Sequence, residues 1–377
     1  MPRSILLASC AFVCAGAVPL AAQDAPPRVA VDIAPIHGLV AQVMAGVGDP
    51  DLVIPPGATP HGYSMRPSEA RMLEAADLII WAGPTLTPWL QAPIESLAGG
   101  AHQLRLLEVE GNVALSFRDG VAFEAHDHDH EGHDHEEHDH EEHDHEDHDH
   151  EAHDHEAHDH EGHDHEGHDH EGHDHEEHDH EEHDHEAHDH EDDHASDHDD
   201  HGHDHSGIDP HAWLDPVNAQ LWLSVIAGEL ARIDPDNAAL YSENAATAQA
   251  ALDVQAADVA DRMAALSGRF VVFHDAYHYF EARFGIEAAG AISLSDAAPP
   301  SPQRMAEIRD LVVDQDITCV FVEPQFNRGI VDAVFDGSDI RITQIDPLGA
   351  ALTPGATLYG ELLEGMADAF EACLGDG

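Results

Sequence analysis

A block of His, Asp and Glu interrupts the first of the two lobes that the sequence predicts. Between Ala125 and Ser206 the sequence repeats the pentad His-Asp-His-Glu-x, as at residues 133–137, and four alanines are its only apolar side chains. So little apolar surface cannot offset the entropy lost when a backbone is ordered, and a period of five residues fits neither a helix nor a strand. We therefore predict a disordered loop over residues 124–205, inserted between folded segments.

The same block contains all but six of the chain's 38 histidines. Imidazole nitrogens and carboxylate oxygens are ligands of zinc and neighbouring divalent metals, so this composition indicates metal binding. An unfolded segment loses entropy for each ion that it chelates, so sites of this kind should be numerous and weak. The alternative is a solvated charge run with incidental metal affinity. Representative accessory ligands are His133, His135, His138 and His140.

Residues 1–23 have the features of a secretory signal peptide. Arg3 precedes an apolar run over residues 5–18, and the small residues Ala21 and Ala22 lie near the expected cleavage point. A lipoprotein-like box at residues 7–10 is the less favoured alternative, because it leaves too short an apolar segment before it. Elsewhere the sequence has no run of about 20 apolar residues that could span a bilayer. We expect an exported mature protein.

The chain is strongly acidic, with a formal charge of -63. About half of the acidic residues lie in the His-rich block, and the remainder of the chain is still negatively charged. Such a surface repels nucleic acid and anionic lipid headgroups, so we expect no nucleic-acid partner.

Removal of the signal peptide would leave two cysteines, Cys319 and Cys373. Thiols oxidise outside the cytosol, so one disulfide between these residues is the simplest expectation. Two buried free thiols are the alternative.

Apolar strands alternate with helical patterns on both sides of the block. We predict strands over residues 28–34, 51–55, 77–82, 270–273, 288–292, 318–322 and 341–345. Helices are predicted over residues 36–47, 66–75, 89–97, 216–232, 235–266, 277–284, 302–313, 329–335 and 358–374. This alternation predicts an α/β fold whose parallel sheets are flanked by helices. The expected parts are a first lobe (26–123 and 206–233), a long linking helix (234–266) and a second lobe (267–377).

Three of the six histidines outside the block lie at the edges of predicted elements. His61 follows the second strand, His211 stands where the chain re-enters the fold, and His274 directly follows a strand. Asp346 follows a later strand. Ligands bind beyond the carboxyl ends of strands in such sheets, and three imidazoles with a carboxylate or water suit tetrahedral zinc. We predict a zinc site between the lobes, although any single one of these histidines has a hydrogen-bonding or core role as its alternative.

The other three histidines carry weaker signals. His37 at the start of the first helix and His102 in a loop are expected to be surface or capping residues. His278 is four residues after His274, on the helix that follows it, and faces the same side, which makes it a candidate for an extra weak ligand.

The regular repeat lacks the spacing of a zinc hydrolase. That motif, His-Glu-x-x-His, needs two histidines four residues apart on one helix face. The pentad places its histidines two, three or five residues apart, and no Glu follows the first residue of the pair His126 and His130. A nucleophile elbow is also missing, so we expect no enzymatic activity.

The chain resembles the ZnuA-like family, the periplasmic zinc-binding components of ATP-driven metal importers. An acidic, His-rich loop inserted at the same place is also typical of that family. The matching stretches cover both predicted lobes in order and lie at residues 56–68, 76–84, 209–216, 273–280, 318–326 and 346–349.

This resemblance implies two α/β lobes that are joined by a long helix and hold a buried zinc ion between them. The family's ligands fall on His61, His211 and His274, with Asp346 as the residue that can complete the shell. Some relatives have Glu immediately before the first His, whereas this chain has Pro60. The fourth ligand is therefore Asp346 or water. Manganese-binding members usually place a carboxylate at the position of His274, so an imidazole there favours zinc over manganese or iron.

By the same resemblance, the protein captures zinc in the periplasm and delivers it to the permease and ATPase subunits of an importer. The loop would collect zinc more weakly, a periplasmic zinc chaperone is a further candidate partner, and we expect a monomer. One alternative is a manganese or iron receptor of the same fold. Another is a periplasmic zinc store or metallochaperone that acts through the loop.

Overall fold

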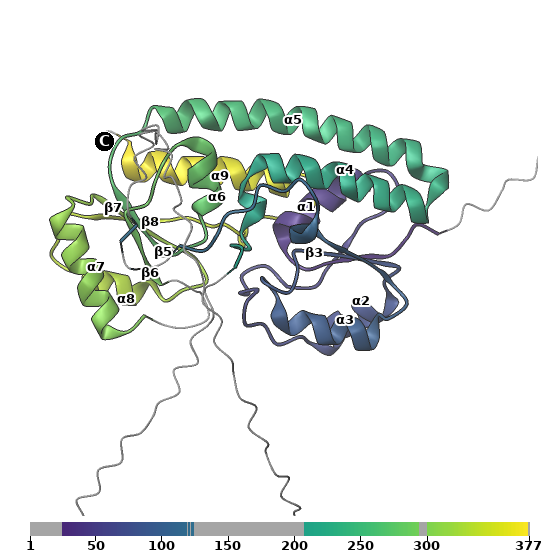
Figure 1. Cartoon of the computed structure of the whole chain (residues 1–377), viewed down its shortest axis with the longest axis horizontal. Helices are drawn as coiled ribbons and strands as arrows, with labels where there is room; N and C mark the ends of the chain where they lie inside the picture. The colour runs from purple at the N-terminus through teal and green to yellow at the C-terminus, as the bar shows by residue number, and fades with distance from the viewer. Residues whose placement is uncertain (1–24, 119, 121, 124–206, 294–299, 376–377) are drawn as a thin grey trace, which may run out of the picture. The chain divides into compact units, whose positions relative to one another are not determined.

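The computed structural model describes residues 25–118, 120, 122–123, 207–293 and 300–375. These ranges contain two four-stranded sheets in which all paired strands run parallel (Figure 1). Helices flank both sheets, so the predicted fold of two α/β lobes is confirmed. The expected signal peptide at residues 1–23 and loop at 124–205 lie outside the described residues.

The first sheet has the strand order β2-β1-β3-β4. Its strands are β1 (Val29–Val31), β2 (Asp51–Leu52), β3 (Leu78–Trp81) and β4 (His102–Arg105). Successive strand residues point to opposite faces, and both faces are covered. Val29 and Ile80 pack in one apolar cluster with helix α1, whereas Ala30 and Ile79 pack in another with α2 and α3. These helices are α1 (Ala34–Val43), α2 (Pro67–Ala75) and α3 (Gln91–Leu97).

The second sheet repeats this arrangement with the order β6-β5-β7-β8. Its strands are β5 (Phe270–His274), β6 (Gly290–Ser293), β7 (Cys319–Val322) and β8 (Arg341–Gln344). Val271 and Val320 face a cluster that includes α7 and α8, whereas Phe270 and Phe321 face α6 and α9. These helices are α6 (His278–Phe284), α7 (Pro302–Asp314), α8 (Arg328–Val334) and α9 (Leu358–Leu374).

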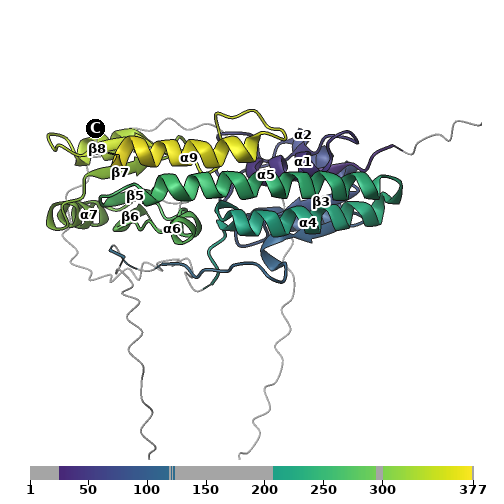
Figure 2. The same cartoon turned by 90° about the horizontal axis from the view of Figure 1, so that it is seen from above.

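Two helices connect the sheets along the chain. They are α4 (Pro216–Ile233) and α5 (Ala238–Ala264), which a short 3₁₀ turn separates at Pro235–Asn237. With 27 residues, α5 is about 40 Å long. It runs beside α4 and α9 in both views (Figures 1 and 2). No described helix combines the length and the apolar composition that a membrane span requires.

Local sequence signals set the starts of several helices. The Asp215 carboxylate accepts a hydrogen bond from the backbone nitrogen of Val217, and Pro216 occupies the first turn of α4. Ser301 caps α7 in the same way, through the backbone nitrogen of Arg304. Capping side chains and early prolines favour helix initiation at these points, which explains why the predicted and observed starts agree closely.

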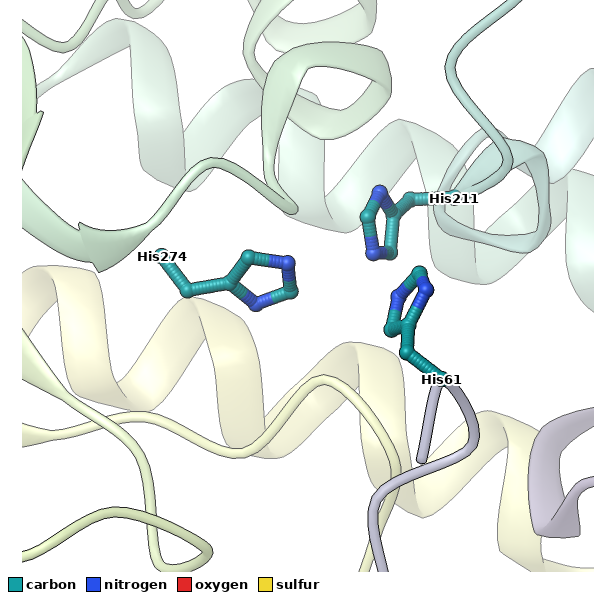
Figure 3. Close-up of side chains that lie close together, drawn as sticks. All are labelled: His61, His211 and His274. Atoms are coloured by element: carbon teal, nitrogen blue, oxygen red, sulfur yellow. The ribbon is translucent and has the colours of Figure 1, made fainter. Parts of the chain in front are cut away.

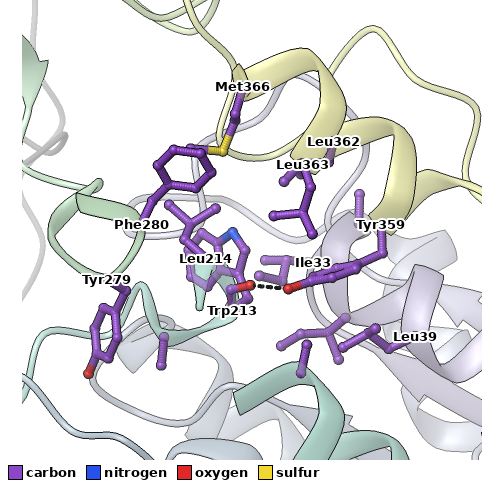
Figure 4. Packing of buried hydrophobic residues seen from close by; sticks show 14 of the residues in the cluster. Ile33, Leu39, Trp213, Leu214, Tyr279, Phe280, Tyr359, Leu362, Leu363 and Met366 are labelled. Carbon is purple, nitrogen blue, oxygen red and sulfur yellow. Dashed lines mark hydrogen bonds between the residues drawn. The ribbon is translucent and has the colours of Figure 1, made fainter. Parts of the chain in front are cut away.

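One apolar core continues from the first lobe into the second (Figure 4). Tyr359 on α9 donates a hydrogen bond of 2.7 Å from its hydroxyl group to the Trp213 carbonyl oxygen. Trp213 donates in turn from its indole nitrogen to the Pro347 carbonyl oxygen, at 2.9 Å. A Cβ atom at Gly38 would lie 3.1 Å from the backbone nitrogen of Tyr359, so glycine permits this close approach of α1 and α9.

A disulfide joins Cys319 on β7 to Cys373 in the last turn of α9. The predicted pairing is therefore confirmed, and the alternative of two free thiols is wrong. The bond fixes the end of α9 on the face of the second sheet.

Candidate metal centre

Three histidines from distant parts of the sequence converge on one point (Figure 3). His61 lies in the loop after β2, His211 precedes a 3₁₀ turn at Ala212–Leu214, and His274 is the last residue of β5. One potential ligand nitrogen from each ring lies within 4.8 Å of the other two. The structure thus brings together the three histidines that were singled out from the sequence.

The surroundings of the three rings are largely apolar. His211 and His274 are buried, and His61 is half-buried. The small pocket between them is also lined by Trp213 and Phe326, whose rings lie 5.2 Å from the His211 ring and 6.0 Å from the His274 ring. Such walls limit the access of water, so an ion here would take most of its ligands from the side chains of the site.

A buried carboxylate orients His211. Nδ1 of His211 lies 2.6 Å from Oδ1 of Asp209, which also accepts a hydrogen bond of 2.9 Å from the His211 backbone nitrogen. Burial raises the pKa of Asp209 to about 7, while the hydrogen bond from the His211 backbone opposes this shift. When Nδ1–H donates to Asp209, the lone pair of the imidazole is on Nε2, the nitrogen that is then suited to bind a metal.

A second buried carboxylate has the same relation to His274. Oε2 of Glu323 lies 3.3 Å from Nδ1 of His274, and Glu323 also lines the pocket. The sequence patterns do not predict Glu323 or Asp209 as site residues. Glu323 directly follows β7 at the strand edge where the ligands were expected, so its position was an available signal. Asp209 had only its closeness to His211 in the sequence.

His61 is positioned through its neighbours in the loop. The indole nitrogen of Trp89 donates a hydrogen bond of 2.7 Å to the carbonyl oxygen of Pro60, the residue before His61. Tyr63 packs against the same indole, with ring centroids 5.7 Å apart, and donates from its hydroxyl group to Glu69 at 2.8 Å. The loop is therefore attached to the first lobe on both sides of His61.

Asp346 has a different role in the described structure. Its two carboxylate oxygens accept hydrogen bonds from the backbone nitrogens of Leu348, at 3.1 Å, and Ala350, at 2.6 Å. It belongs neither to the three-histidine group nor to the pocket lining. Its part as a fourth ligand stays a prediction. The accessory ligands predicted at His133, His135, His138 and His140 lie outside the described residues.

The remaining histidines differ in part from expectation. His37 is buried and its Nε2 lies 3.0 Å from the Pro50 carbonyl oxygen, so the surface or capping interpretation is wrong. His102 is exposed as expected, but it lies on β4 and not in a loop. His278 lies outside the three-histidine group, with Nδ1 at 3.9 Å from Oδ2 of Asp209.

The site therefore offers three imidazole nitrogens as ligands, a donor set suited to zinc. Two buried carboxylates lie beside the imidazoles of His211 and His274 and orient them. Among solved structures, a zinc-bound deletion mutant of ZnuA has the same fold, with a TM-score of 0.60. It is 18% identical, and the match covers 92% of this chain and 98% of that one. At this identity the likeness supports the fold alone.

Sequence comparisons are more specific. The high-affinity zinc uptake system protein ZnuA of Paracoccus denitrificans (strain Pd 1222) is 43% identical over 376 residues, which cover 99% of this chain and 98% of the relative. ZnuA of Brucella abortus (strain 2308) is 39% identical over 347 residues, or 92% and 91% of the two chains. A family model described as zinc-uptake complex component A, periplasmic, matches residues 29–373. Because this match includes both lobes and all three histidines, the chain belongs to the ZnuA family.

Proposed function

We propose that this protein captures zinc in the periplasm and delivers it to an ATP-driven importer in the inner membrane. The observation that carries the proposal is the convergence of His61, His211 and His274, whose potential ligand nitrogens lie within 4.8 Å of one another. Zinc at about 2.1 Å from each nitrogen requires donors roughly 3.4 Å apart, so small ring movements would complete the site. Asp346 or a water molecule supplies the fourth ligand.

The donor set supports zinc over the harder metals. Imidazole nitrogen suits zinc, whereas manganese prefers carboxylate, carbonyl and water oxygens. Glu323 and Asp209 each lie next to Nδ1 of a histidine, an arrangement that raises ligand basicity and fixes ring orientation. A manganese or iron receptor of the same fold is the runner-up.

The relatives support the rest of the pathway. They are named as high-affinity zinc uptake proteins, and the family is described as a periplasmic component of a zinc-uptake complex. The partners are then a permease and an ATPase subunit. A periplasmic zinc chaperone is an optional further partner, and the protein acts as a monomer.

Residues 1–23 serve as the secretory signal. The His-rich loop collects zinc at sites that are weaker than the three-histidine site.

No catalytic role forms part of the proposal. The sequence does contain one His-Glu-x-x-His spacing, at residues 190–194, which corrects the expectation drawn from the regular repeat. It lies outside the described residues, within a stretch that lacks helical apolar periodicity.

Calorimetric zinc titration of single variants tests the proposal. His61→Ala, His211→Ala and His274→Ala should each abolish the tightest binding event, whereas His102→Ala, on the exposed strand β4, should preserve it. Deletion of residues 127–204 should remove the weaker events and leave one tight site. Loss of the tight site in the deletion variant would instead make the loop the receptor.

Growth separates transport from storage. In a host that depends on this protein for zinc uptake, the triple His→Ala variant with an intact loop should fail to grow at low zinc. Unchanged growth would favour a zinc store. Asp346→Asn should lower zinc affinity markedly if the carboxylate is the fourth ligand, and have little effect on it if water is.

A further inference from the structure

A described segment just before the His-rich block connects the two lobes. This stem segment comprises residues 112–123, with 119 and 121 outside the described residues. At its start, the Val113 backbone nitrogen donates to the Asn218 side chain on α4, at 2.8 Å. At its end, Ala122 forms an antiparallel bridge with Gly290 on β6, and the Phe123 nitrogen donates to the Ala289 carbonyl oxygen at 2.9 Å. The stem is thus attached to both lobes.

Arg118 occupies the middle of the stem and forms two bidentate ion pairs. Its Nη1 and Nη2 donate to the two oxygens of Glu281, at 2.6 and 3.1 Å. Its Nε lies 3.1 and 3.2 Å from the two oxygens of Asp275, and its Nη2 donates to Asp275 as well. The side chains of Arg118, Asp275 and Glu281 are only 13%, 6% and 2% exposed. The guanidinium carbon lies 3.9 Å from the centre of the Phe123 ring, which covers it.

These contacts lie next to the metal centre. Asp275 directly follows His274, and the Ala276 nitrogen donates to the His274 carbonyl oxygen at 2.9 Å in the same tight turn. A single guanidinium therefore contacts the carboxylate in the turn that directly follows His274.

We propose that Arg118 is a positioning residue for zinc binding. Its planar fork fixes Asp275 and hence the turn that holds His274. This inference rests on the proposed function of the three-histidine site. Lysine cannot reproduce two bidentate pairs, because its ammonium group is a point charge without a fork.

Zinc affinity should change in opposite directions depending on whether Arg118 acts by fixing the geometry of the site or only by its positive charge. Without the fork, His274 loses its fixed geometry, and losses of such supporting contacts typically lower metal affinity about 10–100-fold. If Arg118 acted only through its charge, its removal would instead raise zinc affinity, because a positive charge near the site repels a cation. Variants that keep or remove the charge separate the two.

The test uses the full mature chain, loaded with one equivalent of metal so that the tightest site fills first. Zinc affinity is measured by competition with a chelator, and cobalt(II) absorption reports ligand geometry. Arg118→Lys and Arg118→Gln should both bind zinc at least about tenfold more weakly than the parent, with a changed cobalt spectrum. Either variant can stand alone if the other fails to fold, as judged by thermal unfolding of the metal-free protein.

Arg283→Gln is the matched control. Arg283 on α6 forms a bidentate pair with Asp215 at the start of α4, with both distances at 2.7 Å, and so also connects the lobes. This variant should lose stability but keep its zinc affinity within about twofold and its cobalt spectrum unchanged. Parent-like affinity in Arg118→Lys, tighter binding in Arg118→Gln, or an equal loss in Arg283→Gln would each overturn the inference. Failure of the parent itself to bind zinc would refute the proposed function instead.

Discussion

Oδ1 of Asp209 contacts both the backbone nitrogen and Nδ1 of His211, at 2.9 and 2.6 Å. One buried oxygen therefore holds the ring and selects the nitrogen that faces a metal. Asp209→Asn replaces the carboxylate by a neutral amide, which is a weaker acceptor. We expect zinc affinity to fall about 10–100-fold, as measured by chelator competition.

Asp234→Asn serves as the control for this prediction. Asp234 accepts a hydrogen bond of 2.7 Å from the Tyr241 hydroxyl group near the start of α5 and does not line the pocket. Its variant should bind zinc like the parent. Equal affinity of Asp209→Asn and the parent would show that Asp209 does not support the metal site.

The Tyr359 hydroxyl group should contribute to stability through its hydrogen bond with the Trp213 carbonyl oxygen. Both residues are buried, so Tyr359→Phe deprives a polar group of a partner where water cannot easily replace it. We expect the free energy of unfolding in urea to fall by about 1–3 kcal/mol. Tyr63→Phe, which removes a partly exposed hydroxyl group, should have a smaller effect. A larger effect of Tyr63→Phe would contradict this assignment.

Asp32 should make stability depend on pH. Burial raises its pKa from 3.8 to about 7, although hydrogen bonds from the backbone nitrogens of Ala82 and Ile33 oppose the shift. The folded state therefore retains a proton that the unfolded state releases near pH 4. Its contribution to stability is complete below that pH and is lost as the pH rises to about 7, by at most roughly 4 kcal/mol.

Asp32→Asn removes this titration and so isolates its effect. Urea unfolding of the metal-free proteins at pH 4.5 and pH 8 should show the parent losing stability relative to the variant as the pH rises. A constant difference between the two proteins would indicate that Asp32 has the same pKa in the folded and unfolded states.

The disulfide should stabilise the second lobe without affecting metal binding. Cys319 and Cys373 are 54 residues apart, and closure of such a loop is worth about 4 kcal/mol in the chain-entropy description. Reduction should lower the urea midpoint, while zinc affinity at low urea stays unchanged, because neither cysteine lines the pocket. A parallel loss of zinc affinity would show that the bond also supports the metal site.

Much of the fold could be predicted because its signals are local. Apolar runs such as Leu78–Trp81 predicted the buried strands, and helical patterns predicted helices that begin at Pro216 and Pro302, where α4 and α7 begin in the structure. Strand β4 escaped prediction because His102–Arg105 has no apolar run, and only its pairing with β3 makes it a strand. The burial of His37 was not predicted, because helix α1 is buried on nearly all sides and its sequence showed no sign that this polar residue faces the interior.

The sequence predicted the three histidines of the candidate site but not the residues that orient them. The rule that ligands gather at strand ends brought out His61 and His274, and it needs no knowledge of contacts. The role of Arg118 depends on hydrogen bonds to a distant segment, which only the folded chain brings together with it. Asp209 is close to His211 in the sequence, but closeness alone does not reveal which way its side chain points. The oxygens of Asp346 accept hydrogen bonds from backbone nitrogens two and four residues later, a local turn that we did not predict from the sequence.

We expect His61, His211 and His274 to hold the tightest zinc ion. Crystals of the mature chain grown with one equivalent of zinc allow anomalous diffraction on either side of the zinc edge. This measurement should show one dominant peak about 2.1 Å from a nitrogen of each of the three rings. A dominant peak elsewhere, with none between these rings, would contradict this expectation.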